Sequence, residues 1–457
     1  MSSFKHNLVK ARSALVFLIG LTLAFWLVYS LETWNPEVVS TEISSRSANK
    51  ITFEQAEPDS RQHRALTLQE KQWAKTAWRY FENNYIPETG LVNSADKYPA
   101  ATMWDTSSYL LGMISARRLD IIDEPEFNKR VSALLKTLGS MPLFEDLLPN
   151  KSYNTRNVAM VTYNNEETDR GIGWSAIDVG RIMVPLNILV WHFPKHNEGV
   201  NQILAHWDLD ALISDAELYG TDISDAGQTL FLQEGRLGYE EYAAKSLALV
   251  GRDVGKALDY ELHTKLVDIY GIDIATDGRK PSEFGALNYV VSEPYILDGV
   301  EYGWDRYSRE LSRRVFNVQQ SRYEQTGVLT AVSEDNIDQA PYFVYNTVFA
   351  DDKAWNAITE SGEDASEYRS VSTKAVLGFH ALYDNDYTAR LVAHISSNYD
   401  AKRGWYSGIY EASGEPNRAI TANTNGIILE SLHYIKFGPM MSMRATNKAL
   451  IAEADEE

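Results

Sequence analysis

The sequence contains no cysteine among its 457 residues, so disulfide bonds, thiolate metal ligands and cysteine nucleophiles are excluded. Its nine histidines are scattered and none lies in HExxH-type spacing. The Asp-rich loops also lack the EF-hand spacing of a Ca²⁺ site. P-loop, dinucleotide-binding and G-x-S-x-G motifs are absent. We therefore predict neither a metal site nor a cofactor.

Basic residues are also in deficit. The 43 Lys and Arg residues face 63 Asp and Glu residues, which leaves a formal net charge of −20. Nucleic-acid binding needs clustered positive charge, so we expect no nucleic-acid partner. The aromatic residues include 11 Trp and 26 Tyr, and many of them stand beside Gly, Asn or Asp. This pattern indicates loops that line a polar cleft, although aromatic core packing explains part of it.

Only one long apolar run occurs near the N-terminus, at residues 14–31, and it follows three basic residues, Lys5, Lys10 and Arg12. Eighteen residues lie near the lower limit for a membrane-spanning helix. The residues after the run lack the small-x-small cleavage site of a signal peptide, which is the competing interpretation. We expect a cytoplasmic tail at 1–13, a single-pass anchor at 14–31 and a polar tether at 32–65.

The remainder, residues 66–438, shows helical periodicity and few alternating strands, and an acidic tail follows at 439–457. Apolar spacing predicts helices at 66–83, 104–119, 126–140, 174–193, 201–207, 237–250, 254–258, 302–326, 345–358, 365–383, 386–398 and 421–434. Twelve helices in six hairpins would close into an α/α toroid whose functional loops share one rim. Separate helical bundles are the alternative.

The stretch YNNEETDRGIGWSAIDVGR, at residues 163–181, is the strongest candidate site. Acidic and amide side chains, among them Glu167, lead through two glycines into a predicted helix. On that helix Trp174, Asp178 and Arg181 fall on one side. An indole beside a carboxylate suits sugar binding. An Asp178–Arg181 ion pair beside a core tryptophan is the alternative.

Further clusters of acids, amides and rings occur at predicted helix starts and loops. They comprise Trp104 with Asp105, Tyr239 with Glu240 and Glu241, the loop that contains Glu293, Trp405 with Tyr406, and Asn423 with Asn425. Capping of helices by Asp105 or Asn423 and a surface ion pair of Glu241 with Lys245 are the structural alternatives. Glycosidic bond cleavage needs one protonated carboxyl group and one carboxylate, and the chain has acids for both.

Several segments together carry a resemblance: YPAATMWDTSSYLLGMISARRL, PNKSYNTRN, NNEETDRGIGWSAIDVGR, GYEEYAAKSLALVG, SEPYILDG and GWYSGIYEASGEPNRAITANTN. They resemble a family of bacterial envelope proteins known as a domain of unknown function. That family is similar to the glucoamylase-like domains of cyclic β-1,2-glucan synthases and to bacterial β-1,2-glucanases. The resemblance covers about residues 66–436 and implies a six-hairpin α/α toroid with a cleft at one end.

The resemblance also implies roles for some residues. The G-[WY]-N-E segment of the glucoamylase-like group matches Gly238 to Glu241, which makes Glu241 the candidate proton donor, with Glu240 where the relatives have Asn. An acidic loop before a Gly-rich helix start matches Glu166, Glu167 or Asp169. Asp105 and Asp178 belong to the closer family's pattern.

We therefore expect an all-α, glucoamylase-like toroid behind a transmembrane helix in the bacterial inner membrane, with most of the chain in the periplasm. The expected activity is that of a glycoside hydrolase or transglycosylase on a β-glucan or an exported polysaccharide. Glu241 would be the general acid, Asp105 or Asp178 the opposing carboxylate, and Glu167 a reserve. The predicted substrate-binding residues are Trp104, Trp174, Tyr239, Glu293, Trp405, Tyr406, Asn423 and Asn425.

Two other functions fit the sequence less well. A non-catalytic glycan-binding or polysaccharide-export accessory protein would keep the aromatic residues without two facing acids. A polysaccharide lyase would need cationic side chains to neutralise a uronate, and the acidic balance argues against it.

Overall fold

The computed structural model describes residues 50–53, 62–234, 236–280 and 287–442. The chain divides into two compact units, Met1–Glu42 and Ile43–Glu457, and every described residue belongs to the second. The predicted anchor at 14–31 and the predicted acidic tail from residue 443 onward lie outside the described residues. Within them, no single helix is long and apolar enough to span a membrane. The adjoining helices Ala176–His192 and Pro194–His206 pass that test together but are bent by 116°.

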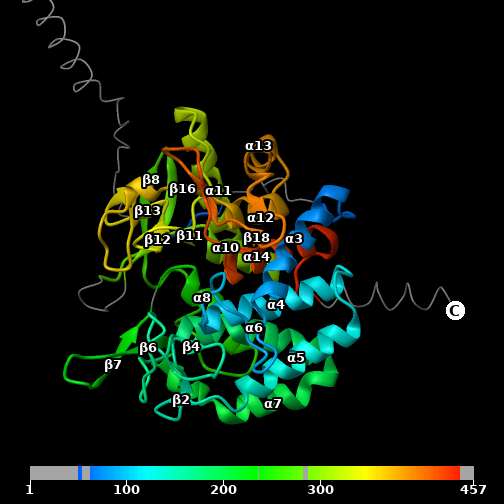
Figure 1. Ribbon diagram of the computed structural model, residues 1–457. Helices are drawn as coiled ribbons and strands as arrows, with labels where there is room; N and C mark the ends of the chain where they lie inside the picture. Colours follow the sequence, from blue (N-terminus) through cyan, green and yellow to red (C-terminus); the bar gives the residue numbers. More distant parts are fainter. Residues whose placement is uncertain (1–49, 54–61, 235, 281–286, 443–457) are drawn as a thin grey trace, which may run out of the picture. The chain divides into compact units, whose positions relative to one another are not determined.

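Six helical segments form a closed inner ring (Figure 1). In order around the ring they are α4 (Met103–Arg118), α6 (Ala176–His192), α8 (Tyr239–Ala248), α10 (Glu293–Leu297) with the π-helical turn η3 (Asp298–Tyr302), α12 (Thr373–Leu382) and α14 (Ala422–Phe437). Each packs against the next, and α14 packs against α4. The order places α4 opposite α10, α6 opposite α12 and α8 opposite α14.

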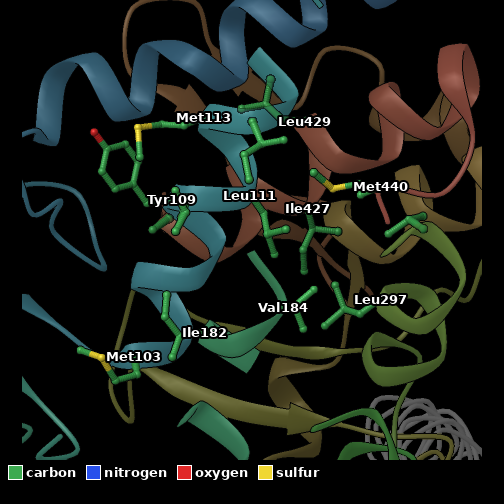
Figure 2. Packing of buried hydrophobic residues seen from close by; sticks show 14 of the residues in the cluster. Met103, Tyr109, Leu111, Met113, Ile182, Val184, Leu297, Ile427, Leu429 and Met440 are labelled. Atoms are coloured by element: carbon green, nitrogen blue, oxygen red, sulfur yellow. The ribbon is translucent and has the colours of Figure 1, made fainter. Parts of the chain in front are cut away.

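The inner helices are buried on nearly all sides. In α14 every residue from Ala422 to Ile435 is buried. Figure 2 shows side chains of α4, α6, α10 and α14 converging in one apolar core. Small residues allow the helices to approach closely: a Cβ added to Gly180 of α6 would lie 2.5 Å from the Cβ of Ala243 in α8. Because they are buried on all sides, these helices carry apolar residues on more than one face, together with buried polar residues such as Arg181 and Glu430.

Outer helices cover this ring and are apolar on one side. They are α3 (Leu68–Asn84), α5 (Glu124–Leu138), α7 (Asn197–His206), α11 (Arg306–Thr326) and α13 (Asp386–Ile395). Their neighbours in the inner ring are α14 for α3, α4 for α5, α6 for α7, α10 for α11 and α12 for α13. Between α8 and α10 the described chain forms the hairpin of β8 (Thr264–Ile269) and β9 (Ile272–Asp277), which packs on α11. The predicted helical hairpins are thus present, with a β-hairpin in this interval.

Short strands are more numerous than the sequence pattern predicted. Besides β8 and β9, three antiparallel pairs occur: β1 (Ala100–Ala101) with β4 (Tyr153–Asn154), β2 (Leu143–Phe144) with β3 (Leu148–Pro149), and β17 (Tyr399–Asp400) with β18 (Gly404–Trp405). Two antiparallel three-stranded sheets are β5 (Ile213–Ser214), β6 (Glu217–Ile223) and β7 (Thr229–Gln233), and β10 (Tyr289–Val290), β13 (Phe349–Ala350) and β14 (Lys353–Ala354). Two more are β11 (Glu334–Asn336), β12 (Phe343–Asn346) and β15 (Ala357–Ile358), and β16 (Ser370–Ser372), β19 (Gly408–Tyr410) and β20 (Pro416–Asn417). Short 3-10 turns also occur at Pro194–His196 (η1), Leu209–Leu212 (η2) and Ser366–Tyr368 (η4). Almost all of these strands lie in connections between helices.

Three helix predictions are wrong. Residues 345–358 form strands β12 to β15 because Tyr345 and Ile358 pair across the sheet, which helical periodicity did not reveal. Residues 254–258 form turns. The helix predicted at 365–383 begins only at Thr373, after strand β16. The sequence analysis also missed α10, a five-residue helix with a proline at its second position.

Candidate functional site

The first turns of the inner helices meet in one cluster. Trp104 of α4 donates from Nε1 to Oε1 of Glu293 in α10 (3.2 Å), and Asn423 of α14 donates to the same oxygen (2.9 Å). Lys374 of α12 forms an ion pair with the other oxygen, Oε2. Tyr239 of α8 packs edge-on against Trp104, with ring centroids 5.5 Å apart. Residues far apart in the sequence therefore share one end of the ring.

Glu293 and Lys374 form the floor of this cluster. Both side chains are buried, and Oε2 of Glu293 also accepts a hydrogen bond from Ser333 (3.1 Å). Burial lowers the pKa of Lys374, but Glu293 and Asp335 raise it further, so that the net shift is upward. The lysine is therefore a fixed cation beneath the acids of the cluster.

A buried ion network fills the ring beneath the floor. Arg181 of α6 binds Glu301 (3.1 Å) and Tyr242 (2.8 Å), and it lies 3.6 Å from Glu430 of α14. Its guanidinium lies 4.5 Å from the ring centroid of Trp104. Arg181 thus pairs with these acids, and the alternative of an Asp178–Arg181 ion pair is wrong.

Asp105 and Asp178 lie at the third position of α4 and α6. Thr102 and Ser175 are the N-caps, and each accepts from the backbone N–H of its aspartate. Burial raises the pKa of both carboxyl groups, and that of Asp178 reaches about 7 because Glu234 and Asp105 add like charge. The two acids therefore belong to one electrostatic cluster.

Loop residues complete the cluster. Tyr289 donates to Oε2 of Glu334 (3.0 Å) and stacks on Tyr345 at 4.1 Å between ring centroids. Arg236 lies over Tyr289, 5.1 Å from its centroid. Glu234 accepts from Ser175 and from the N–H of Ile177 at the start of α6, both at 3.0 Å.

The pKa of Glu334 is raised to about 7. Burial and Glu293 raise it, whereas Lys374 and Arg236 lower it. Burial also raises the pKa of its neighbour Asp335 to about 7. Glu334 is partly exposed while Asp335 is buried, so only Glu334 is placed to meet a ligand from solvent.

Solvent reaches several side chains at this end of the ring, which we call the mouth. Trp104, Asp105, Asp178, Glu334 and Tyr345 are all partly exposed. Yet the surrounding protein desolvates both aspartates, Glu334 and Tyr345 enough to raise each pKa. Six helix N-termini meet at the mouth, and their partial positive charge favours anionic groups there.

Six of the predicted site residues lie in this cluster: Trp104, Asp105, Asp178, Tyr239, Glu293 and Asn423. For some, the role differs from the prediction. Both oxygens of Glu293 are held by protein groups, and Asn423 binds Glu293 and Ser108, so these two side chains shape the floor. Asp105 and Asn423 are not N-caps, because Thr102 and Thr421 occupy those positions.

Three predicted sugar contacts are wrong. Trp174 and Trp405 are fully buried and donate to the carbonyl oxygens of Tyr219 and Trp73, so neither presents a ring face to solvent. Asn425 is also buried, and its amide bonds to backbone groups of Trp405 and Thr421. These side chains hold loops and helices together.

Tyr406 is half-buried and packs against the main hydrophobic core. Its backbone N–H donates to the carbonyl oxygen of Asn398 (3.1 Å). Its predicted contact with a sugar stays a prediction.

Glu167 and Glu241 lie elsewhere. Glu167 is exposed and bonds to Asn157 (2.8 Å). Glu241 reaches back to the N–H of Gly238 (2.6 Å) as part of a capping box, and burial and Glu240 raise its pKa to about 8. Residues two apart on a helix do not face the same way, and Tyr239 is the residue of α8 that packs on Trp104. The predicted pairing of Glu241 with Asp105 or Asp178 therefore finds no support in these contacts.

Glu240 lies in a separate ion network. It pairs with Arg279 (2.8 Å) and accepts from Gln233 (2.9 Å) and from the N–H of Leu218 (3.2 Å). These bonds fix the β6–β7 hairpin and the chain after β9 to the start of α8. Glu240 is thus a structural residue.

The sequence analysis missed several members of the cluster, namely Glu234, Arg236, Tyr289, Glu334, Asp335, Tyr345 and Lys374. Lys374 carried a usable signal, since a cation in the first turn of an apolar helix opposes the helix dipole and suggests a nearby anion. The others lie on short strands and loops whose spatial neighbours come from distant parts of the chain. Among the described residues, no group of three or more His, Asp or Glu is arranged to hold a metal ion.

Comparison with known proteins identifies the fold. The family model described as a protein of unknown function (DUF3131) matches residues 72–438. No functionally curated protein matches the sequence.

Several solved structures share the fold at low sequence identity. A glucoamylase-like protein from Bacteroides caccae superposes with a TM-score of 0.59 at 12% identity, over 84% of this chain and 97% of that one. The endo-β-1,2-glucanase from Chitinophaga pinensis, in complex with sophorotriose and glucose, gives 0.56 at 12% identity over 85% and 98% of the two chains. The endo-β-1,2-glucanase from Talaromyces funiculosus, in complex with sophorose, gives 0.55 at 12% identity over 84% and 86%. The inner and outer helices described above thus form the α/α toroid of glucoamylase-like proteins.

Proposed function

Because this chain belongs to the DUF3131 family, which is described as being of unknown function, we propose its function from the cluster at the helix N-termini. The protein is a glycan-active enzyme, a glycoside hydrolase or transglycosylase, that acts on a β-glucan or an exported polysaccharide. The observation that carries this proposal is the pair Asp178 and Glu334. Both are partly exposed carboxyl groups at one mouth, and each has a pKa raised to about 7 in a different environment.

The two environments assign the roles. Asp178 lies near the carboxylates of Glu234 and Asp105, which oppose its ionisation. Glu334 lies near Lys374 and Arg236, which favour its ionisation. Carboxyl groups whose surroundings differ in this way serve as acid and base. Both pKa values are about 7, so each group is partly protonated near neutral pH; we assign the proton to Asp178, which has carboxylates beside it, and the ionised role to Glu334, which has Lys374 and Arg236 beside it.

In the reaction, Asp178 donates its proton to the glycosidic oxygen as the bond from that oxygen to the anomeric carbon breaks. Glu334 either accepts a proton from the water that attacks the anomeric carbon or attacks that carbon itself. Asp105, with its raised pKa, is the reserve for either role. The anomeric configuration of the first product, followed by NMR, distinguishes the two courses.

The fold relatives support a β-linked glucose polymer as the substrate class, since two of them are endo-β-1,2-glucanases bound to β-linked glucose oligosaccharides. The net charge of −20 also favours a neutral polymer over a polyanion.

Activity is tested with the full chain in detergent and linear β-1,2-, β-1,3- and β-1,4-glucans, by following new reducing ends. We expect Asp178→Asn and Glu334→Gln each to lose about 100-fold or more in kcat. Glu167→Gln is the matched control because the side chain of Glu167 is exposed and accepts a hydrogen bond from Asn157 at the surface. Full activity in both site variants would refute the assignment. Glycan binding without turnover would favour the non-catalytic accessory protein.

We also propose that residues 14–31 anchor the chain in the bacterial inner membrane, with the remainder in the periplasm. The apolar run and the basic residues before it support this orientation. Alkaline phosphatase fused after residue 442 would be active in cells if the proposal holds and inactive if the chain stays in the cytoplasm.

A further inference from the structure

The exposed aromatic side chains of the described residues are unevenly distributed over the molecule. Five are prominent: Tyr98 (39% exposed), Tyr163 (57%), Trp191 (40%), Phe231 (63%) and Tyr342 (65%). Four of these stand in the segments that lead into the inner helices α4, α6, α8 and α12. Only Trp191 lies at the opposite, C-terminal end of an inner helix.

Two of these four rings belong to segments that are bonded to each other. Tyr98 donates from its hydroxyl to the carbonyl oxygen of Tyr163 (2.9 Å), which joins the segments before α4 and α6. Burial and the charge of Asp178 raise the pKa of the Tyr163 hydroxyl well above 10, so this hydroxyl lies within reach of the charge of the proposed proton donor. The residue as a whole is 57% exposed.

Phe231 lies on strand β7 and precedes Glu234 by three residues. Three residues of extended chain span about 10 Å, which is more than one hexose ring extends. On the other side, Tyr342 precedes Tyr345 by three residues and follows the strand that carries Glu334 and Asp335. An exposed ring therefore occurs close in sequence to the acids on each of these two segments.

The surroundings of the rings indicate the occupant. Exposed polar residues flank Tyr163, namely Asn164 and Glu166, and exposed Gln339 and Pro341 precede Tyr342. A protein partner needs a contiguous apolar patch. Separate rings between polar groups suit a sugar chain, whose apolar ring faces and hydroxyl edges alternate.

We propose that Tyr98, Tyr163, Phe231 and Tyr342 form outer binding positions for a polysaccharide chain that extends beyond the acids at the mouth. This inference rests on the proposed function only for the place at which the polysaccharide is cleaved. Binding by these rings needs no catalysis, so the two proposals fail separately.

The test uses full-length protein in detergent and affinity gel electrophoresis in β-1,2-glucan, laminarin and carboxymethylcellulose. Wild type is expected to be retarded by at least one polymer, and Tyr163→Ala and Tyr342→Ala to weaken that retardation about tenfold. Trp191→Ala is the control, because it removes an exposed aromatic ring from the other end of α6 and is expected to bind like wild type.

A second measurement distinguishes the role of the exposed rings from that of the catalytic acids. Where glucan is cleaved, Tyr163→Ala and Tyr342→Ala, called the rim variants, are expected to raise KM for the polymer while kcat/KM for a trisaccharide such as sophorotriose stays within twofold. Unchanged polymer binding in both rim variants, or no retardation of wild type by any polymer, overturns the inference. If the polymer retards wild type, the rim variants weaken this retardation and no glucan is cleaved, the inference holds and the proposed enzymatic function is refuted.

Discussion

Trp104 and Glu293 lie 189 positions apart in the sequence, and the indole N–H of the first bonds to the carboxylate of the second at 3.2 Å. Trp104 is the second residue of α4 and Glu293 the first residue of α10, and these helices stand opposite each other in the inner ring. This bond therefore crosses the mouth of the ring. Asn423 and Lys374 converge on the same carboxylate from two further helices, so Glu293 fixes four helix ends at once.

Replacement of Glu293 by Gln is therefore expected to destabilise the protein strongly. The buried Lys374 would lose its nearest anion and keep Asp335 at 3.8 Å, so the cost is below the full cost of an uncompensated buried charge, which is about 3–5 kcal/mol. Glu82→Gln is the control, since the Arg79–Glu82 pair lies on the surface with the two side chains 57% and 36% exposed, and such pairs contribute at most about 1 kcal/mol. Urea unfolding of both variants checks this. Equal midpoints would show that Glu293 is not a structural centre.

The pH dependence of turnover is expected to be bell-shaped with a maximum near pH 7. Asp178 and Glu334 both have pKa values of about 7, so the acid loses its proton above that pH and the base gains one below it. The acidic limb of kcat/KM therefore reports mainly Glu334 and the alkaline limb mainly Asp178. A rate that is constant from pH 5 to 9 would exclude both groups from the rate-determining chemistry.

Arg236 is expected to set the acidic limb of that profile. Its charge lowers the pKa of Glu334, so Arg236→Met should raise this pKa and move the acidic limb to higher pH by up to about one unit, within the range that nearby charges cause. The alkaline limb, which belongs mainly to Asp178, should move less. A uniform fall of the rate without any displacement of the limbs would indicate that Arg236 acts only through packing on Tyr289.

Much of the helical arrangement could be predicted from the sequence, because α3, α5 and α7 have an apolar side at helical spacing and α4, α6 and α14 are long segments with many apolar residues. Predicted bounds for α4 (104–119) differ by one residue from Met103–Arg118. Asp105 and Asp178 were also identified, since an acid in the first turn of an apolar helix is recognisable locally.

The partner of Asp178 could not be predicted in the same way. Glu334 lies on a three-residue strand, and only its pairing with Tyr345 and its bond from Tyr289 bring it to the mouth. Trp174 and Trp405 show the opposite case: they were predicted to bind sugar and are buried. Their neighbours in the sequence are those of a binding loop, but the residues that bury them come from distant segments. The local sequence shows which residue types stand at which position of a helix. Whether a side chain is exposed depends on how the helices and loops pack together in the ring.

Because the inner helices pack closely, a single added methyl group at Gly180 is expected to destabilise the folded protein. A Cβ there would lie 2.5 Å from the Cβ of Ala243 and 2.9 Å from its Cα, so α6 and α8 would have to move apart. Gly180→Ala is expected to lower the free energy of unfolding by about 1–3 kcal/mol, as overpacking does. Gly255→Ala, whose Cβ meets only Asp253 at 3.7 Å, is the control. A stability of Gly180→Ala equal to that of the control would show that the helices adjust freely.

Asp178 is also expected to make the protein less stable as the pH rises. Its pKa increases from 3.8 to about 7 on folding, mainly through burial, so the folded state holds a proton that the unfolded state releases. Stability is therefore highest below about pH 4 with respect to this group, falls as the pH rises towards 7, and changes no further above it. The shift corresponds to at most about 4 kcal/mol, and the partial exposure of the side chain reduces that amount.

Asp178→Asn removes this titration, because the amide stays neutral and its size matches the carboxyl group. The variant should unfold at nearly the same urea concentration as wild type near pH 4.5 and at a clearly higher one at pH 8. Asp169→Asn, an exposed acid in the preceding loop, should follow wild type at both pH values. Were Asp178→Asn less stable than wild type at pH 8, the carboxylate would be a stabilising anion and could not serve as the group that holds the proton.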